Sequence, residues 1–279
     1  MISAALRYVA EHPGRAFGAL ARNPVSVWET LNDRLVQRRE FARGPYTPAA
    51  DPEWERKLTL WLGTEPYGVR EDFDRLWPQV IGDMESRHVP TGPMSFAGYN
   101  DGDRGFVRAV WRLVRGMRPA HVVETGVAHG MTSRFILEAM ERNNAGRLWS
   151  IDRLPLDPGM QARVGIAVGE PRPFRWKLIV GTSRQRLPGL LASLGEIDIF
   201  IHDSLHTEKN VCFELERAWE AVKPGGVIVV DDIDSNWGFH SFTKDRSGFQ
   251  TIICEAEPIR PDPRRFNGKG LFGIILKNR

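Results

Sequence analysis

The sequence has little cysteine, no long apolar run and almost no net charge. Cys212 and Cys254 are its only cysteines, which argues against a disulfide framework and against a cysteine-based zinc site. No stretch reaches the roughly eighteen consecutive apolar residues of a membrane span, and charged residues interrupt the start of the chain, so we expect neither a span nor a signal peptide. The formal net charge of +3 comes with scattered arginines and predicts no nucleic-acid partner. These absences favour a cytoplasmic protein.

Length and composition allow a large globular unit. The chain has 279 residues, of which 42% are hydrophobic and 26% charged, and both fractions are ordinary for globular proteins. Residues 2–44 follow a helical pattern, and residues 45–100 combine prolines and aromatic residues without a sustained strand pattern. We predict that residues 1–100 form an N-terminal extension of helices and loops, serving as a lid, an oligomer contact or a structural collar. Residues 101–279 are predicted to form the main domain.

The stretch 121–134 organises the chain. A short β-rich run ends in an acid, a turn of small residues follows, and an apolar-periodic helix begins near Thr132. Gly126 and Gly130 have no Cβ atom, so a ligand can lie directly on this turn, and the free N–H groups at the helix start favour a carboxylate, a phosphate or a ribose. The dinucleotide fingerprint G-x-G-x-x-G is not matched, because Ala128 occupies its second glycine position. A tight turn without a ligand is the alternative interpretation.

Short apolar strands alternate with helical segments after this turn. The alternation predicts an α/β fold, with a mostly parallel sheet covered by helices on both faces. The last two strands have no helix between them, so they should pair as an antiparallel hairpin at one edge. The predicted strands, about seven in all, lie within residues 121–124, 147–152, 176–181, 197–203, 227–230, 249–254 and 271–277.

Asp152 ends the second of these strands, 22 residues beyond Gly130. At the carboxyl edge of a parallel sheet, a carboxylate in this position can accept hydrogen bonds from both hydroxyls of an adenosine ribose. An acid at the end of a strand can equally cap a helix. The preceding glycine turn is the feature that favours ribose binding.

Three further carboxylates follow neighbouring strands. Asp203 comes after the fourth strand, and Asp231 and Asp232 come after the fifth. Because unpaired carboxylates in a cleft lose several kcal/mol each, a cation or protons must compensate them. Oxygen ligands select a hard ion, so the sequence predicts a Mg²⁺ or Mn²⁺ site, with solvated strand-end caps as the alternative. His202 should point to the opposite side of its strand from Asp203.

The pattern Glu124-x-Gly-x-Ala-x-Gly resembles the first motif of class I S-adenosylmethionine-dependent methyltransferases, where a small residue often replaces the second of three glycines. A sheet of about seven strands with an antiparallel edge is also typical of that family. The resemblance implies a Rossmann-like fold, S-adenosylmethionine as the cofactor, and a loop at Ser183 that lies along the adenine. The cofactor-binding residues that we predict are Glu124, Thr125, Gly126, Val127, Gly130, Ser133, Asp152, Ser183 and Asp203.

Residues 107–242 also resemble a narrower family, the metal-dependent O-methyltransferases of the macrocin type. The features that match are Asp203-x-x-His206, a helix after it, and the stretch 224–232, which ends in two acids. Members of that family methylate sugar hydroxyls on natural products, and its relatives include a cephalosporin-modifying group. The resemblance therefore implies a hydroxyl acceptor.

The same resemblance assigns roles to the later acids. It implies that Asp203, Asp231 and Asp232 hold Mg²⁺ or Mn²⁺ and that His206 is the catalytic base. Two positions depart from the usual family sequence, Leu205 and Glu208, and they bear on the acceptor more than on the metal.

These patterns lead to one main hypothesis and two alternatives. The main hypothesis is an S-adenosylmethionine-dependent O-methyltransferase that uses a divalent metal and methylates a small-molecule hydroxyl, on a sugar or a glycosylated natural product. The alternatives are an NAD(P)-dependent oxidoreductase on a similar α/β fold and a cofactor-binding protein without turnover. The sequence does not specify the acceptor, and it leaves homo-oligomerisation open.

Overall fold

The computed structural model describes residues 32, 35–36, 39–40, 44, 46–63, 66–96, 99–155, 157–169, 174–262, 265 and 268–278. The helix predicted within residues 2–44 lies mostly outside them. None of the helices in the described part of the chain has the length and hydrophobicity of a membrane span.

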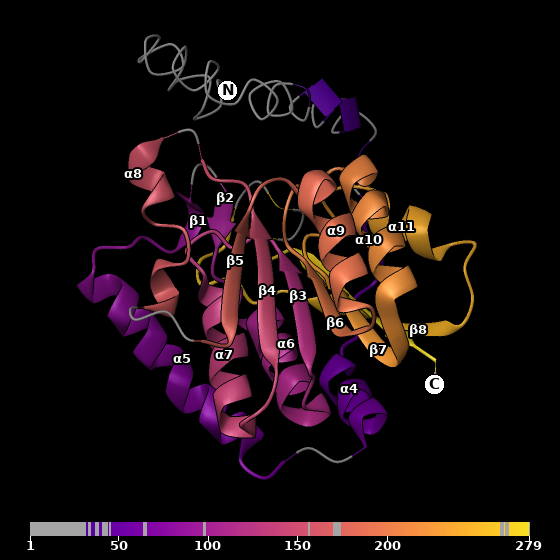
Figure 1. Ribbon diagram of the computed structural model, residues 1–279, viewed down its shortest axis with the longest axis horizontal. Coiled ribbons are helices and arrows are strands. Elements are labelled where there is room, and N and C mark those ends of the chain that lie inside the picture. The colour runs from indigo at the N-terminus through magenta and orange to yellow at the C-terminus, as the bar shows by residue number, and fades with distance from the viewer. Residues whose placement is uncertain are drawn as a thin grey trace.

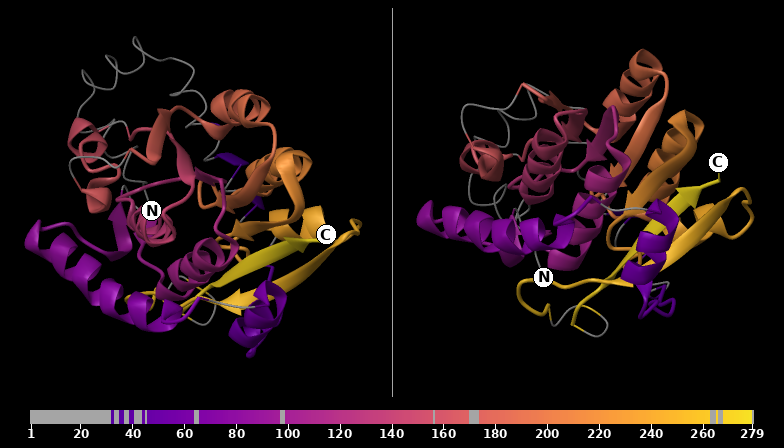
Figure 2. Two further views of the ribbon diagram at one scale, coloured as in Figure 1. Left: turned by 60° about the horizontal axis from the view of Figure 1, so that its bottom comes forward. Right: turned by 90° about the horizontal axis from the view of Figure 1, so that it is seen from below.

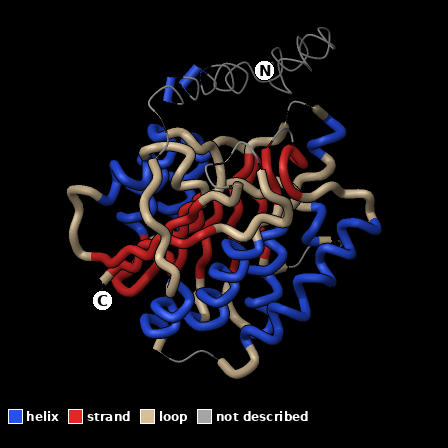
Figure 3. Tube along the Cα trace, turned by 180° about the vertical axis from the view of Figure 1, so that it is seen from behind, coloured by secondary structure: helices blue, strands red, loops and turns tan. Residues whose placement is uncertain are grey.

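A seven-stranded sheet forms the centre of the molecule (Figures 1 and 3). Its strand order is β5-β4-β3-β6-β7-β9-β8, in which β3 to β7 are parallel and β9 is antiparallel to both of its neighbours. The strands are β3 (His121–Thr125), β4 (Arg147–Asp152), β5 (Trp176–Val180), β6 (Ile197–His202), β7 (Val222–Val230), β8 (Phe249–Glu255) and β9 (Leu271–Lys277). A separate antiparallel pair is formed by β1 (Gly92–Phe96) and β2 (Tyr99–Asp101).

Helices cover both faces of the sheet (Figures 1 and 2). One face carries α4 (Trp54–Leu62), α5 (Val69–Ser86), α6 (Arg104–Met117) and α7 (Met131–Asn143). The other carries α9 (Ser183–Leu194), α10 (Glu208–Ala221) and α11 (Gly238–Thr243). The short helices α8 (Pro158–Gln161) and η1 (Ile166–Val168) lie between β4 and β5 in the chain.

The alternation of side chains along each strand divides the core into two layers. In β3, Val122 packs with the α4–α7 side, whereas Val123 packs with the α9–α11 side. Burial of apolar residues on both faces explains why these strands are nearly continuous apolar runs, as the sequence predicted. The α/β fold, its mostly parallel sheet and the antiparallel edge are confirmed.

Three details differ from the predicted arrangement. Strand β9 not only pairs with β8 but also lies between β8 and β7. The β1–β2 pair lies largely within residues 45–100, where the sequence showed no sustained strand pattern. Helix α11 follows β7 where no helix was predicted. All three depend on tertiary pairing or on segments too short to show a period.

The described part of residues 1–100 packs closely on the rest of the chain. Trp54, Leu58 and Phe73 are buried in the same core cluster as helices α6 and α7. The backbone N–H of Asp51 donates to the carbonyl of Ile253 at 2.8 Å, which ties this segment to β8. We therefore expect its removal to destabilise the main domain. The division at residue 100 and the lid role stay predictions.

Candidate functional site

The carboxyl ends of the parallel strands meet at one edge of the sheet. Thr125 at the end of β3 pairs in register with Ile151 of β4 and His202 of β6, and His202 pairs with Val230 of β7. The residues at and after these strand ends include the site residues that were predicted from the sequence. The domain core therefore brings the predicted cofactor and metal residues to a single edge.

The turn at residues 126–130, here called the glycine turn, needs glycine for close packing of the chain. Gly126 has φ +84°, and a Cβ atom there would overlap the carbonyl oxygen of Asp203. Gly130 has φ +86°, and its Cβ would lie 2.8 Å from the Cα of Gly165. Both glycines thus let the turn pack against neighbouring segments, a reason that adds to the predicted one of ligand access.

Glu124 and Ser133 lie beneath the glycine turn and interact with each other. Glu124 is only 1% exposed, and its Oε2 accepts hydrogen bonds from Ser133 Oγ and Ser150 Oγ, both at 2.7 Å. Burial raises the pKa of Glu124 to about 7, although the two hydroxyls oppose this shift. The arrangement joins β3, β4 and α7 under the turn.

Asp152 holds the glycine turn from the side. Its Oδ2 accepts hydrogen bonds from the backbone N–H groups of Val127 at 3.0 Å and Ala128 at 3.1 Å. Burial raises the pKa of Asp152 to about 6, and these backbone donors oppose the shift. Ala128 has φ +50°, a left-handed conformation that the two bonds help to maintain. Asp152 therefore shapes the turn at the position predicted for ribose binding.

Two other predicted cofactor residues have side chains directed into the protein. Thr125 Oγ1 donates to Glu214 Oε2 at 2.5 Å and is fully buried. Ser183, the first residue of α9, is buried and donates to Asn210 Oδ1 at 3.4 Å. Both side chains therefore bind polar residues of α10, namely Glu214 and Asn210.

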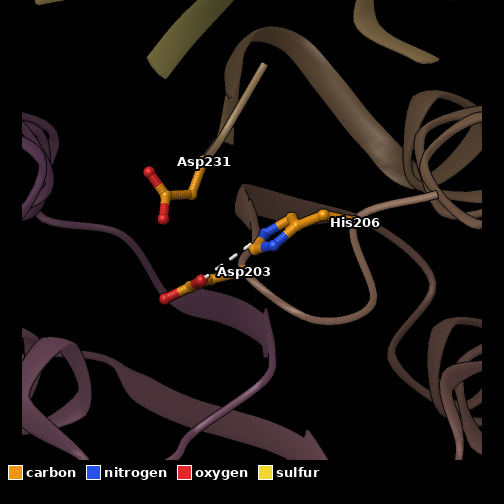
Figure 4. Close-up of side chains that lie close together, drawn as sticks. All are labelled: Asp203, His206 and Asp231. Atoms are coloured by element: carbon orange, nitrogen blue, oxygen red, sulfur yellow. Dashed lines mark ion pairs between the residues drawn. The ribbon is translucent and has the colours of Figure 1, made fainter. Parts of the chain in front are cut away.

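Asp203, His206 and Asp231 form the acidic group (Figure 4). One ligand atom from each residue lies within 4.8 Å of the others. Burial raises the pKa of Asp203 and of Asp231, and repulsion from Asp232 adds to both shifts. Two carboxylates are thus held close together, a geometry that suits a bound cation.

Asp232, which the sequence also placed among the metal ligands, contacts both His206 of this group and Arg265. Its Oδ2 accepts from Arg265 Nη2 at 2.5 Å, and Arg265 Nη1 also contacts Asp234 Oδ1 at 3.4 Å. Burial alone would raise the pKa of Asp232, but the Arg265 guanidinium holds it below its ordinary value. Asp232 has φ +53°, so the backbone turns between the two adjacent acids.

His206 lies between Asp203 and Asp232. Its Nδ1 is 3.3 Å from Asp232 Oδ2, and its Nε2 is 3.7 Å from Asp203 Oδ1. Nε2 is buried and has no hydrogen-bond partner among the described residues. Burial lowers the pKa of His206 to about 4, so the imidazole is neutral at pH 7.

Sequence reasoning missed a buried network behind the acidic group. Glu214 is fully buried, and its Oε2 also accepts from His202 Nδ1 at 2.7 Å, while its Oε1 accepts from Ser204 Oγ at 2.7 Å and Asn210 Nδ2 at 2.9 Å. His202 thus binds Glu214, and its ring lies edge-on to that of His206 with centroids 5.4 Å apart. The available signal was the position of Glu214, which lies three residues after Val211 on the apolar face of α10.

Arg265 and the His129–Asp101 pair were also missed. His129, within the glycine turn, lies with its Nδ1 2.6 Å from Asp101 Oδ2 of β2, and its ring contacts Phe96 edge-on with centroids 4.9 Å apart. These contacts hold the β1–β2 pair against the turn. They join segments distant in the sequence, so no local pattern could reveal them.

Comparisons with known proteins agree with this geometry. Residues 123–233, which include every predicted site residue, match the family model of a methyltransferase domain. None of the curated proteins matches the chain. A candidate O-methyltransferase from Klebsiella pneumoniae is similar in structure, with a TM-score of 0.51 and 14% identity over 80% of this chain and 96% of that chain.

An O-methyltransferase from Bacillus cereus, solved in complex with SAH, has a TM-score of 0.50 and 12% identity over 80% of this chain and 96% of that chain. At these identities the structural likeness shows the fold. Together with the domain match, it confirms the resemblance to class I methyltransferases. The chain thus has the class I methyltransferase fold, with residues 123–233 matching a methyltransferase domain.

Proposed function

We propose that this protein transfers a methyl group from S-adenosylmethionine to a hydroxyl of a small-molecule acceptor, assisted by a divalent metal ion. The observation that supports the proposal is the presence of two chemically different subsites at one sheet edge. The glycine turn follows β3, Asp152 ends β4, and the acidic group follows β6 and β7. Because β3 and β6 are neighbours, a cofactor on the turn would lie beside an acceptor at the acidic group.

The first subsite fits a nucleoside cofactor. Helix α7 begins immediately after the glycine turn, so its free N–H groups lie at that turn. Asp152 lies beside the turn with a carboxylate that can accept ribose hydroxyls. The match of residues 123–233 to a methyltransferase domain supports S-adenosylmethionine over a dinucleotide.

The second subsite fits a divalent ion. Asp203 and Asp231 have raised pKa values because they are buried near other carboxylates, and the buried Nε2 of His206 lacks a hydrogen-bond partner within the described part of the chain. An ion held by these residues would relieve both conditions. When bound, it would lower the pKa of an acceptor hydroxyl.

The chain's own residues position the reacting groups. Asp203 and Asp231 would hold the ion, and Asp232 orients the imidazole of His206 through Nδ1. Close packing of Gly126 against the Asp203 carbonyl fixes the distance between the two subsites. The macrocin-type resemblance supports a sugar or a glycosylated natural product as the acceptor class.

A methyl-transfer assay tests this proposal. The protein would be incubated with S-adenosylmethionine carrying a labelled methyl group and with a panel of hydroxylated acceptors that includes free and glycosylated sugars. We expect labelled product and an equal amount of S-adenosylhomocysteine, loss of turnover with EDTA, and recovery with Mn²⁺. Full activity after exhaustive chelation would remove the metal from the proposal. Bound cofactor without product from any acceptor would favour the non-catalytic alternative.

A further inference from the structure

The acidic group has a mixed set of donors. Two of its members are carboxylates, Asp203 and Asp231, and the third is the imidazole of His206. Their ligand atoms lie within 4.8 Å of one another, whereas ligands on a common ion at bonds of about 2.0–2.3 Å lie roughly 3–4.5 Å apart. Small side-chain rotations would therefore bring all three onto one ion.

The third acid at this edge is engaged by an internal cation. Arg265 Nη2 contacts Asp232 Oδ2 at 2.5 Å, and both side chains are less than one fifth exposed, at 16% and 19%. The backbone N–H of Arg265 donates to the carbonyl of Asp262 at 2.9 Å, which anchors the arginine in its loop. The Oδ2 atom of Asp232 is thus already paired with a cation of the chain itself.

Asp232 instead supports the histidine. Its Oδ2 lies 3.3 Å from His206 Nδ1, so that ring nitrogen can donate a proton to the carboxylate and leave the Nε2 lone pair free on the side of Asp203. A carboxylate on one ring nitrogen and a metal on the other is the usual arrangement of a metal-binding histidine. The chain Arg265–Asp232–His206 orients the imidazole in this way.

We infer that the acidic group binds a transition-metal ion of the Mn²⁺, Fe²⁺ or Co²⁺ class in preference to Mg²⁺, with His206 as a ligand and not as the catalytic base. This inference rests on the metal site of the proposed function. Mg²⁺ prefers oxygen ligands and dehydrates reluctantly, whereas an imidazole suits the later ions. A histidine that gives its Nε2 lone pair to a metal cannot accept the acceptor's proton with the same atom.

Metal titration of the chelator-treated protein tests the inference without any turnover. Binding of Mn²⁺ would be followed by electron paramagnetic resonance, and Mg²⁺ would be measured by its competition with Mn²⁺. Because Mn²⁺ binds most sites more tightly than Mg²⁺, the informative quantity is how the ratio of the two affinities changes between variants. We expect His206→Ala to weaken Mn²⁺ at least about tenfold and Mg²⁺ by less than about threefold.

Two further variants sharpen the test. His206→Asp makes all three donors oxygen atoms, so the preference for Mn²⁺ over Mg²⁺ should fall by roughly tenfold even if His206→Ala fails to fold. His88→Ala removes an exposed histidine and should change neither affinity. S-Adenosylhomocysteine binding by each variant reports whether its fold is intact.

The outcomes separate this inference from the proposed function. If His206→Ala lowers turnover but leaves both metal affinities unchanged, His206 is the base, and the inference fails while the metal site survives. If both affinities fall equally in His206→Ala and His206→Asp, the imidazole nitrogen of His206 does not determine which metal ion binds, and the inference fails. If wild type binds no metal, the inference and the metal part of the proposal fail together, whereas methyl transfer is judged by its own assay.

Discussion

Carboxylates at the two halves of the sheet edge are compensated in different ways. At the ends of β3 and β4, Glu124 accepts hydrogen bonds from two serine hydroxyls and Asp152 accepts them from two backbone N–H groups. After β6 and β7, Asp203 and Asp231 face each other beside an imidazole nitrogen that has no partner within the described part of the chain. The first half satisfies its acids with hydrogen bonds from the protein, and the second places two acids where a cation would satisfy them.

The first half of the sheet edge is therefore defined by its backbone shape, and the second by its negative charge. Hydrogen bonds from the turn to Asp152 fix the backbone before a cofactor arrives, so binding there needs little reorganisation. In the acidic group, burial and neighbouring carboxylates raise the pKa values of Asp203 and Asp231, and a bound metal would favour their charged forms. We therefore expect substitutions in the first half to change fold and cofactor affinity, and substitutions in the second to change metal affinity.

The largest expected effect comes from Gly126→Ala. This substitution changes the contact between the glycine turn and Asp203, where the two halves of the sheet edge meet. The new Cβ would overlap the Asp203 carbonyl at a left-handed φ, so we expect a loss of about 3 to 5 kcal/mol in the free energy of unfolding. Urea denaturation measures this loss. Gly195→Ala is the matched control, because Gly195 has φ +75° but no atom of the described residues lies within 4 Å of the added Cβ. It should cost only about 1 to 2 kcal/mol. Equal losses in both variants would show that the Asp203 contact is unimportant.

Asp231→Asn tests the charge in the second half alone. Removing one of two facing carboxylates should weaken Mn²⁺ by roughly 100-fold, while the dissociation constant of S-adenosylhomocysteine changes by less than about threefold. Calorimetry with each ligand gives both numbers. Asp245→Asn alters an acid that is 85% exposed and should leave metal affinity unchanged. A parallel loss of both ligands in Asp231→Asn would contradict the separation of the halves.

Asp152→Ala tests the first half. We expect S-adenosylhomocysteine to bind about ten- to a hundredfold more weakly, since the variant loses both the predicted ribose contact and two bonds that shape the turn. Metal affinity should stay within about threefold. Asp157→Ala removes another acid in the same loop region, the N-cap of α8, and should leave cofactor binding intact. An unchanged dissociation constant in a folded Asp152→Ala protein would remove Asp152 from the cofactor site.

Glu124→Gln gives the smallest expected effect and reports on burial. Burial raises the pKa of Glu124 from 4.5 to about 7, so between these pH values the folded chain binds a proton that the unfolded chain does not. The free energy of unfolding should therefore fall as the pH rises, by about 1 kcal/mol between pH 5.5 and 6.5, and Gln should abolish this contribution. Denaturation of both proteins at several pH values measures the difference. Identical slopes would show that Glu124 titrates normally.

The sequence revealed the sheet because its strands are buried on both faces. Their nearly continuous apolar runs marked positions, and the lack of a helix between residues 254 and 271 predicted an antiparallel edge. The place of β9 between β7 and β8 could not be predicted, since an apolar strand does not specify its partner. The β1–β2 pair was missed because five- and three-residue strands show no usable period.

The site was predicted at the level of strand ends and not of side-chain partners. Chain order placed Asp152, Asp203 and Asp231 at one edge, and the structure brings them there. The sequence did not distinguish Asp231 from Asp232, whereas in the structure the backbone turns at Asp232 and its carboxylate contacts Arg265. That arginine lies 33 residues along the chain, beyond the reach of any local pattern.

The most direct test of the two-half account is calorimetric titration of chelator-treated protein with S-adenosylhomocysteine and with NADH, each repeated after loading with Mn²⁺. We expect S-adenosylhomocysteine to bind in both conditions with dissociation constants within about threefold, because the glycine turn and Asp152 are shaped by the protein itself. We expect no heat from NADH. Binding of NADH without S-adenosylhomocysteine, or S-adenosylhomocysteine binding only when Mn²⁺ is present, would contradict it.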